Sequence, residues 1–428
     1  MHRRLRVLFV PFGSEGDINP LLWLAGLLAE RGHRAEFLIT PHYGHLISRR
    51  GMPWHAVGTE EDFLSIANDP AVWKPGIGTW RVAQAMRKSL LAYRKAFRAA
   101  GGRFDLVVTS SFGIAGAALA EARGIPHLML HLQPVCLRSR DDLPVMAKGA
   151  AWLCEAPGLV QNAAFLCVDA VLNRTLLPPL NNFRKSLGLG PLRDFYRDAL
   201  HRATGIGLLF PPWFAKPQPD WPKGVRQFDF PSVRFGDNPL PPGLLTWLQS
   251  GESPVLWTHG SANVHLAESQ ELACGVTEAV GGRALLVGKI PPGFALPPSM
   301  FHCAHVPFED VLPRCRAIVH HGGIGTMSKA FAAGIPQLVL PLAHDQHDNA
   351  ARLRRLRCGL EARATKPAAA AALQNILESE KFPAYTARCR ALSSDNPGRG
   401  KEIADWAEAL ADAPGPHGNF GNSSLAAQ

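Results

Sequence analysis

The sequence predicts an α/β protein of two Rossmann-like domains that face a central cleft. The chain has 428 residues, which is more than one ordinary hydrophobic core accommodates. Short apolar runs alternate with helical segments in both halves, which is the pattern of parallel βαβ units. A Pro-rich stretch over residues 210–245 separates the halves and has the composition of a stiff linker.

The N-terminal half begins with a βαβ unit. We expect a strand over Leu5–Val10, a helix over Leu21–Arg31 that Gly32 ends, and a strand over Ala35–Thr40. A second unit comprises strand Leu106–Thr109, helix Gly113–Arg123 and strand Pro126–His131. Residues 54–100 and the Pro-broken helices expected over residues 135–200 are excursions from the sheet, rich in large apolar residues. Such excursions often build a pocket for an apolar substrate.

The C-terminal half repeats the alternation. We expect strands over Val255–Thr258, Ala284–Val287 and His302–Val306, followed by a strand–loop–helix–strand unit over residues 317–342. The predicted division is a first domain over 1–225, a linker over 226–245, a second domain over 246–398, a final helix over 399–412 and a flexible tail over 413–428.

Composition limits the class of protein. Hydrophobic residues make up 46% and charged residues 19%, as in globular domains. No apolar run approaches the roughly 18 residues that span a bilayer, and the start of the chain has the pattern of a first strand, not of a signal peptide, so a cytoplasmic protein is expected. The eight cysteines form no CxxC pair, which predicts reduced thiols and no structural zinc.

The formal net charge of +10 favours an anionic partner. No stretch interleaves basic and aromatic residues, so we expect no nucleic acid. The cluster of Arg352, Arg354, Arg355 and Arg357 is expected to be a solvated face. Peripheral attraction to the inner face of a membrane is a secondary expectation.

One stretch, VHHGGIGTMSKAFAAGIPQLVLPLAHDQHDNAARL over residues 319–353, carries the most specific chemistry. Glycines directly after a strand let backbone amides approach an anion, and the helix that follows favours negative charge at its start. His321 can donate a hydrogen bond to a phosphate oxygen. The predicted phosphate-binding residues are His321, Gly322, Gly323, Gly325 and Thr326.

A second loop ends the next strand of this unit. Asp345 and Gln346 offer acceptors and donors on adjacent residues, which suits vicinal sugar hydroxyls, and Asn349 could add a donor one turn later. Because ligands bind beyond the carboxyl ends of parallel strands, the two loops should flank one ligand. Two alternatives stay open: the glycines only tighten a turn, or His320, His321, His344 and His347 bind a metal.

The loop after the first strand reads Gly13-Ser14-Glu15-Gly16-Asp17. It is not GxGxxG, so hydride transfer is weakly supported. Asp17 lies where a helix cap is common, and it is also a candidate general base, with Glu15 as a rival. An ordinary Asp is a weak base for an alcohol, although burial would raise its pKa.

These motifs resemble the nucleotide-sugar signature of the family 1 glycosyltransferases, which have the two-domain GT-B fold. Within that family, LLFPPWFAKPQPDWP (208–222), DPAVWKP (69–75) and GSEGDINP resemble the subgroup of the rhamnosyltransferase B subunit of rhamnolipid synthesis. The likeness runs through roughly residues 5–410. It implies a donor that is a dTDP- or UDP-sugar, carrying rhamnose or glucose, with no other cofactor and no metal.

The resemblance also implies site residues. Many family members place a His as the general base where this chain has Asp17, and the usual partner acid is missing from VVTSSF (107–112). Asp17 would then act directly in a single inverting displacement, with Gly16 beside it. Gly260 and Ser261 match the second phosphate loop, and Val306 and Phe308 the nucleobase site, for which core packing is an equal alternative.

The implied acceptor is a small hydrophobic molecule, either a β-hydroxy fatty acid dimer or a polyketide or phenolic aglycone. A sugar-nucleotide epimerase or hydrolase would need a further acid/base set, which the sequence lacks. A non-catalytic nucleotide-sugar-binding partner of another transferase is a third hypothesis. Oligomeric state and the need for a partner protein stay open.

Overall fold

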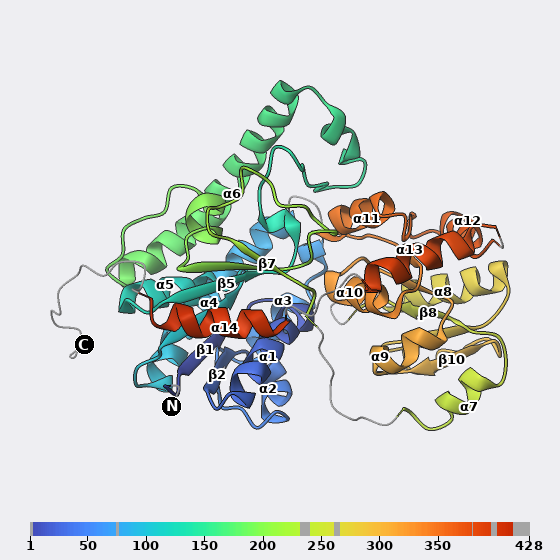
Figure 1. The fold of residues 1–428 in the computed structure, drawn as a ribbon, viewed down its shortest axis with the longest axis horizontal. Coiled ribbons are helices and arrows are strands. Elements are labelled where there is room, and N and C mark those ends of the chain that lie inside the picture. The colour runs from blue at the N-terminus through green and yellow to red at the C-terminus, as the bar shows by residue number, and fades with distance from the viewer. Residues whose placement is uncertain are drawn as a thin grey trace.

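Two α/β lobes lie side by side, each built around one parallel sheet with helices packed against it (Figure 1). The computed structural model describes residues 3–73, 77–231, 240–260, 266–378, 380–394 and 400–413. Two parallel-sheet domains are therefore as predicted.

The first sheet has seven parallel strands in the order β3-β2-β1-β4-β5-β6-β7. They are β1 Arg6–Val10, β2 Arg34–Ile39, β3 Trp54–Ala56, β4 Leu106–Ser110, β5 His127–His131, β6 Gly205–Leu209 and β7 Arg226–Phe228. Strand β7 carries the sheet slightly past residue 225. The strand order reverses between β1 and β4, which pair through Val7 and Leu106. The loop after β1 therefore opens at a topological switch point, where α/β proteins bind ligands.

The helices of this lobe are α1 Glu15–Glu30, α2 Pro41–Ser48, α3 Glu60–Ala67, α4 Ile77–Ala100, α5 Ile114–Arg123 and α6 Gly158–Ser186. Helix α1 begins at Glu15, well before the predicted Leu21. Ser14 and Asp17 form a reciprocal capping box that satisfies free amides at the helix start. Asp17 therefore lies in the first turn of α1 and not in a loop.

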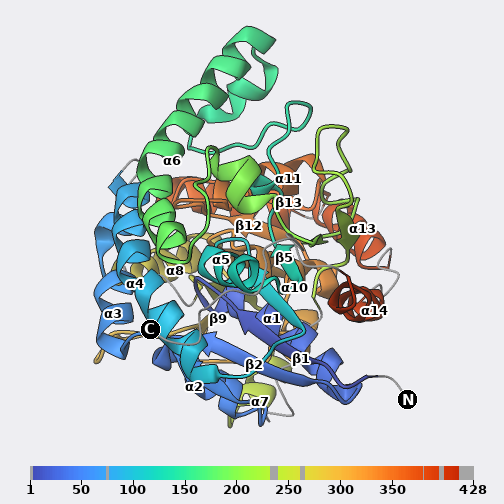
Figure 2. The same ribbon diagram turned by 90° about the vertical axis from the view of Figure 1, so that its left-hand side faces the viewer.

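Helix α6 corrects two expectations. It runs without a break through Pro178 and Pro179, because Leu176, Leu177 and Leu180 on the same turns are buried in the core. By length and composition alone it is also apolar enough to cross a membrane, and only 17% of its most apolar window is buried. Its first half projects beyond the body of the lobe (Figure 2).

The second sheet has six parallel strands in the order β10-β9-β8-β11-β12-β13. They are β8 Val255–Thr258, β9 Ala284–Val287, β10 Met300–Cys303, β11 Ala317–His320, β12 Gln337–Val339 and β13 Gly359–Glu361. The helices are α7 Leu244–Gln249, α8 Leu266–Val280, α9 Phe308–Val311, α10 Ile324–Ala333, α11 Gln346–Arg355, α12 Lys366–Leu377 and α13 Phe382–Ser394. Strand β10 ends before Val306, earlier than predicted. Strands β8 and β11 meet at the switch point of this lobe.

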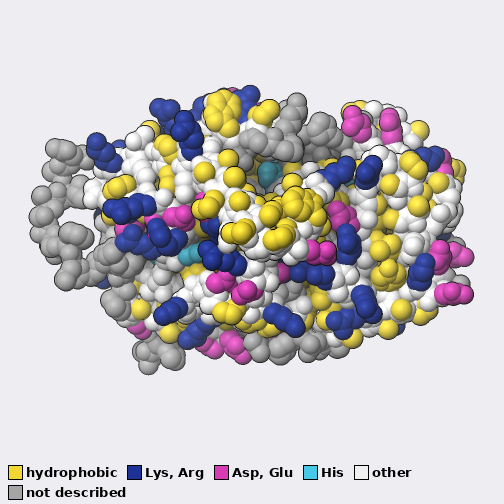
Figure 3. Space-filling model, turned by 90° about the horizontal axis from the view of Figure 1, so that it is seen from above, with side chains coloured by type: hydrophobic (Ala, Val, Ile, Leu, Met, Phe, Trp, Pro, Cys, Tyr) yellow, Lys and Arg dark blue, Asp and Glu magenta, His cyan; other side chains and the backbone are white. Residues whose placement is uncertain are grey.

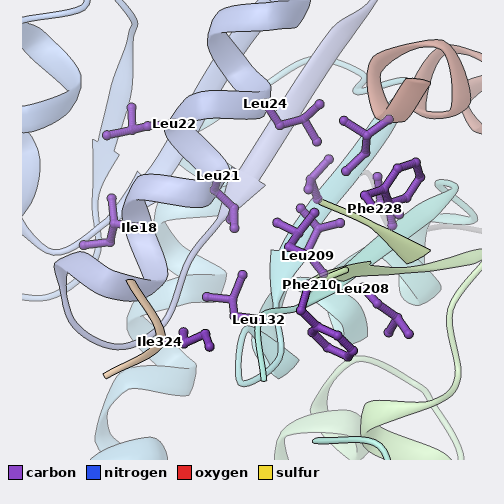
Figure 4. Packing of buried hydrophobic residues seen from close by; sticks show 14 of the residues in the cluster. Ile18, Leu21, Leu22, Leu24, Leu132, Leu208, Leu209, Phe210, Phe228 and Ile324 are labelled. Carbon is purple, nitrogen blue, oxygen red and sulfur yellow. The ribbon is translucent and has the colours of Figure 1, made fainter. Parts of the chain in front are cut away.

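One hydrophobic cluster joins the two lobes. Ile18 of α1 and Leu132 after β5 lie close to Ile324, the first residue of α10 (Figure 4). The ring of Trp213 in the first lobe meets the ring of Phe331 edge-on, with centroids 5.1 Å apart. The starts of α1 and α10 are thereby held near one another across the cleft.

The last helix, α14 Gly400–Ala411, crosses back to the first lobe. Its Trp406 packs on Phe228 of β7 with ring centroids 5.7 Å apart, and its Asp405 pairs with Arg31 at 2.6 Å. The tail beyond residue 413 lies outside the described residues.

Candidate active site

The Gly-rich loop after β11 leaves open space before α10. Gly322 has a φ of +96°, a conformation that other residues rarely adopt. A Cβ atom at Gly325 would meet no atom within 4 Å, so the backbone there faces a free volume. The first amides of a helix lack intrahelical acceptors. An anion placed before α10 would therefore meet free N–H groups and the positive end of the helix dipole.

The His321 ring lies between two glycines. A Cβ at either Gly260 or Gly323 would overlap the imidazole, so both positions require glycine. His321 Nδ1 has no hydrogen-bond partner among the described residues, and neither does the buried Nε2 of His259. An unpaired buried polar atom is costly unless a ligand or water completes it. These two imidazoles beside the loop thus indicate a polar ligand.

Burial keeps both imidazoles neutral. Desolvation lowers the pKa of His321 to about 4, with a smaller contribution from His259, and lowers the pKa of His259 to about 4 as well. His321 therefore offers one N–H group near neutral pH in the empty site. The charge of a bound diphosphate would favour its protonation and strengthen that bond.

His320 has a different role from its neighbour. Its Nε2 lies 3.0 Å from Gln337 Oε1, and its Nδ1 accepts the amide of Gly322 at 3.1 Å. Both ring nitrogens are therefore used to hold the Gly-rich loop. The predicted Ser261 lies outside the described residues, and Thr326 is half-buried in the first turn of α10.

The Asp345 loop is tied to the Gly-rich loop by one side chain. The Nδ2 group of Asn349 donates to Gly322 O at 2.9 Å and to Asp345 Oδ2 at 2.7 Å. Both of its amide hydrogens are in use, so Asn349 positions the two loops, whereas we expected it to donate to the ligand. Gln346 Oε1 accepts the amides of Leu342 and Ala343, at 2.7 and 3.1 Å, and so closes the loop.

Asp17 and Asp345 face the same cleft from opposite lobes. Burial raises the pKa of Asp345 to about 7, and the charge of Asp17 raises it further while the Asn349 bond lowers it. Burial likewise raises the pKa of Asp17 to about 6 against the opposing bonds from Ser14. Ile18, the neighbour of Asp17, packs near Ile324 at the start of α10, so segments more than 300 positions apart in the sequence meet where the two lobes face each other.

The two oxygens of the Asp17 carboxylate allow it to cap the helix and to act as a base. The amide and hydroxyl of Ser14 both donate to Oδ2, at 2.9 and 3.3 Å. Oδ1 has no such bond among the described residues and can take a proton. At the end of β4, where a partner acid would lie, Ser110 Oγ accepts the amide of Phe12 at 3.0 Å. Asp17 thus has no second carboxylate from that strand.

The two predicted nucleobase residues differ. The Val306 side chain is buried in the core of the second lobe, so only its backbone could meet a base. Phe308 is half-buried at the start of α9, with Lys329 Nζ 5.3 Å from its ring centre. Contact between the Phe308 ring and a nucleobase stays a prediction.

Sequence reasoning missed a buried ion cluster between the lobes. Arg352 is only 3% exposed, and it pairs with Asp348 at 2.8 Å and with Asp142 of the first lobe at 2.6 Å. Asp348 also accepts the amide of Val145 at 3.1 Å. The expected solvated face is therefore wrong for Arg352. The available signal was the i,i+4 spacing of Asp348 and Arg352.

The chain is similar to known glycosyltransferases in sequence. Residues 287–410 match the family described as "Erythromycin biosynthesis protein CIII-like, C-terminal domain". The chain is 29% identical to O-mycaminosyltylonolide 6-deoxyallosyltransferase of Streptomyces fradiae, covering 96% of this chain and all of that one. It is 28% identical to dTDP-epi-vancosaminyltransferase of Amycolatopsis orientalis, covering 78% of this chain and 79% of that one.

Solved structures share the whole architecture. The calicheamicin glycosyltransferase CalG4 superposes with a TM-score of 0.69 at 22% identity, covering 95% of this chain and 98% of that one. The spinosyn rhamnosyltransferase SpnG, solved with thymidine diphosphate, superposes with a TM-score of 0.65 at 18% identity, covering 94% and 100%. The chain therefore has the two-domain fold of these glycosyltransferase structures, and its sequence is similar to glycosyltransferases along nearly its whole length. None of the four relatives named here is a rhamnolipid enzyme.

Proposed function

We propose that the chain is an inverting, metal-independent glycosyltransferase that moves a deoxysugar from a dTDP donor to a hydroxyl of a polyketide or similar aglycone. The observation that carries this proposal is the placement of Asp17 opposite the Gly-rich and Asp345 loops. The carboxylate of Asp17, whose pKa is raised to about 6, lies in the lobe opposite the proposed anion-binding and sugar-binding loops, and its neighbour Ile18 packs near Ile324 at the start of α10.

The chemistry is a single displacement. The acceptor oxygen attacks the anomeric carbon, and its proton passes to Asp17 Oδ1. The bond from that carbon to the diphosphate oxygen breaks, and its electron pair stays on the diphosphate. Donor groups already fixed in place stabilise this charge: the first amides of α10 and the His321 N–H. Because the pKa of Asp17 is raised, it is a stronger base than an ordinary Asp and is still ionised at neutral pH.

The donor assignment rests on the relatives. One carries dTDP in its name, and another was solved with thymidine diphosphate. We propose that Phe308 and the Val306 backbone meet the thymine and that Asp345 and Gln346 bind the sugar hydroxyls. Asp345 is held for this by Asn349, whose bond takes up only one of the carboxylate oxygens.

A second candidate is transfer of rhamnose to a β-hydroxy fatty acid dimer. It is favoured by the resemblance of residues 208–222, which the structure places against the second lobe through Trp213 and Phe331. UDP-glucose as donor is the corresponding alternative for the nucleotide.

A mass-spectrometric transfer screen tests these assignments. dTDP-glucose, dTDP-L-rhamnose and UDP-glucose are each crossed with macrolactone and phenolic aglycones and with the fatty acid dimer, with and without EDTA. We expect a dTDP-dependent, EDTA-insensitive product on an aglycone, with inverted anomeric configuration by NMR. Asp17→Asn serves as the background control. A lipid product would support the second candidate, free sugar alone would indicate a hydrolase, and donor binding without any product would contradict catalysis.

A further inference from the structure

Helix α6 turns an apolar face towards solvent. The exposed residues of its first half recur every three or four positions: Leu159, Val160, Ala163, Leu166, Cys167, Ala170, Val171 and Arg174. All but the last are apolar, and Leu159 and Leu166 are 85% and 68% exposed. At 100° per residue they cover about 140° of the helix. A water-soluble helix would normally turn such a face inwards.

The less exposed side of this half of the helix mixes polar and apolar residues, and specific contacts hold it against the protein. Asp169 pairs with Arg138, whose guanidinium lies 4.2 Å from the centre of the Phe165 ring. Gln161 Nε2 donates to Leu153 O at 3.1 Å. The contacts of Asp169, Phe165 and Gln161 hold this side of the helix against the protein, so the apolar face on the other side points towards solvent.

A neighbouring segment widens the apolar surface. Trp152, in the 3₁₀ turn Ala150–Glu155 before α6, is 61% exposed, and Met146 is 40% exposed. We refer to residues 146–174 as the arm. Seen from above, hydrophobic side chains gather over the middle of this face, with Lys and Arg side chains beside them (Figure 3). Contiguous exposed patches of this kind mark interaction sites.

The shape and charge of the arm favour a lipid surface over a single partner helix. A helix-pairing seam is narrower than the exposed stripe, and Trp152 extends the surface beyond the helix. Tryptophan is also favoured at the membrane–water interface. The solvent side carries Lys148 and Arg174 against the single carboxylate of Glu155, and the whole chain has a net charge of +10. The positive balance of the arm and of the whole chain complements anionic headgroups.

We propose that the arm inserts its apolar face into the interfacial region of an anionic phospholipid bilayer. It lies on the membrane and does not span it. The projecting part, residues 158–174, is about 25 Å long at 1.5 Å per residue, shorter than a hydrocarbon core of about 30 Å, and the second half of α6 is anchored in the lobe by buried residues such as Leu176, Leu180 and Phe183. This proposal does not depend on the sugar chemistry.

Vesicle flotation with the full chain tests it. The probes are phosphatidylcholine vesicles with and without phosphatidylglycerol. We expect flotation with the anionic vesicles, weakened by high salt. Leu166→Glu should lower the partition coefficient between vesicles and water tenfold or more, because a side chain that inserts into the bilayer is replaced by a charged one. The matched control is Leu245→Glu, at a 41% exposed position on α7 at the opposite side of the molecule. Unchanged circular dichroism and thermal melting show that each variant is folded.

A second readout places the contact. Brominated phospholipids should quench the fluorescence of the wild type more than that of Trp152→Phe. Three results would overturn the proposal: no flotation with anionic vesicles, equal loss in Leu166→Glu and Leu245→Glu, or a vesicle-free dimer by light scattering that Leu166→Glu converts to monomer. The last result would assign the arm to a second copy of this chain.

Discussion

Both lobes place their candidate site residues after a strand at the switch point of a parallel sheet, but the two sets of residues are held in different ways. In the second lobe, two loops are linked through one side chain, because Asn349 Nδ2 donates to the backbone oxygen of Gly322 and to Asp345 Oδ2. In the first lobe, Asp17 stands on the cap of its own helix and bonds only to Ser14 among the described residues. Holding a charged donor takes several groups in one arrangement, whereas removing a proton takes one carboxylate with a free oxygen. We propose that the lobes divide the work, with donor binding in the second lobe and proton removal in the first.

The largest effect should come from the first lobe. Asp17→Asn keeps the cap acceptor and removes the base, so we expect turnover to fall by about 10²–10⁴-fold. Initial rates with a saturating donor measure this. Glu15→Gln is the control and should change turnover little. Near-normal turnover of Asp17→Asn would show that another group takes the proton.

The next largest effect is expected on stability, from the buried ion cluster between the lobes. Arg352→Met removes the cation that pairs with the buried Asp348 and leaves Asp142 with Arg355 alone, and breaking a buried pair costs about 3–5 kcal/mol. The urea midpoint of unfolding should fall accordingly. Arg354→Met, at a side chain 55% exposed, should stay within about 0.5 kcal/mol of the wild type. Equal effects of the two changes would mean that the cluster contributes no specific stability.

The bridge between the donor loops should have a smaller effect. Asn349→Ala leaves Gly322 O and Asp345 without their shared donor, and about tenfold weaker donor binding is expected for one lost hydrogen bond of this kind. Calorimetric titration with the nucleotide sugar measures it, with the exposed Gln374→Ala on α12 as control. If affinity is unchanged, the loops hold their arrangement without Asn349.

The pH dependence gives the smallest effect. Asp17 must be ionised to accept a proton, and its pKa is raised to about 6. kcat/KM should therefore rise about fivefold between pH 5 and pH 6 and level off above pH 7. A rate that stays level down to pH 5 would indicate a base with an ordinary carboxyl pKa.

The strand, Gly-rich turn and helix start of the donor loop could be predicted because the signal is local: glycines, a His and a helix start lie within seven positions of each other. The ligand contacts of these residues stay a prediction. The early start of α1 was also readable, since Ser14 and Asp17 have capping-box spacing. For Arg352, the spacing indicated only the ion pair with Asp348, and its burial could not be predicted because the partner in the other lobe, Asp142, lies 210 positions away. The exposure of α6 contradicts the general rule that apolar helices are buried, so only the three-dimensional structure could show it.

Titration of dTDP into the wild type, His321→Ala and Asp17→Asn tests the division between the lobes most directly. Loss of a hydrogen bond to a charged ligand should raise the dissociation constant of His321→Ala about 10–100-fold. Asp17→Asn should bind dTDP like the wild type. If Asp17→Asn weakened binding as much as His321→Ala, or His321→Ala bound normally, binding and chemistry would not be divided between the two lobes.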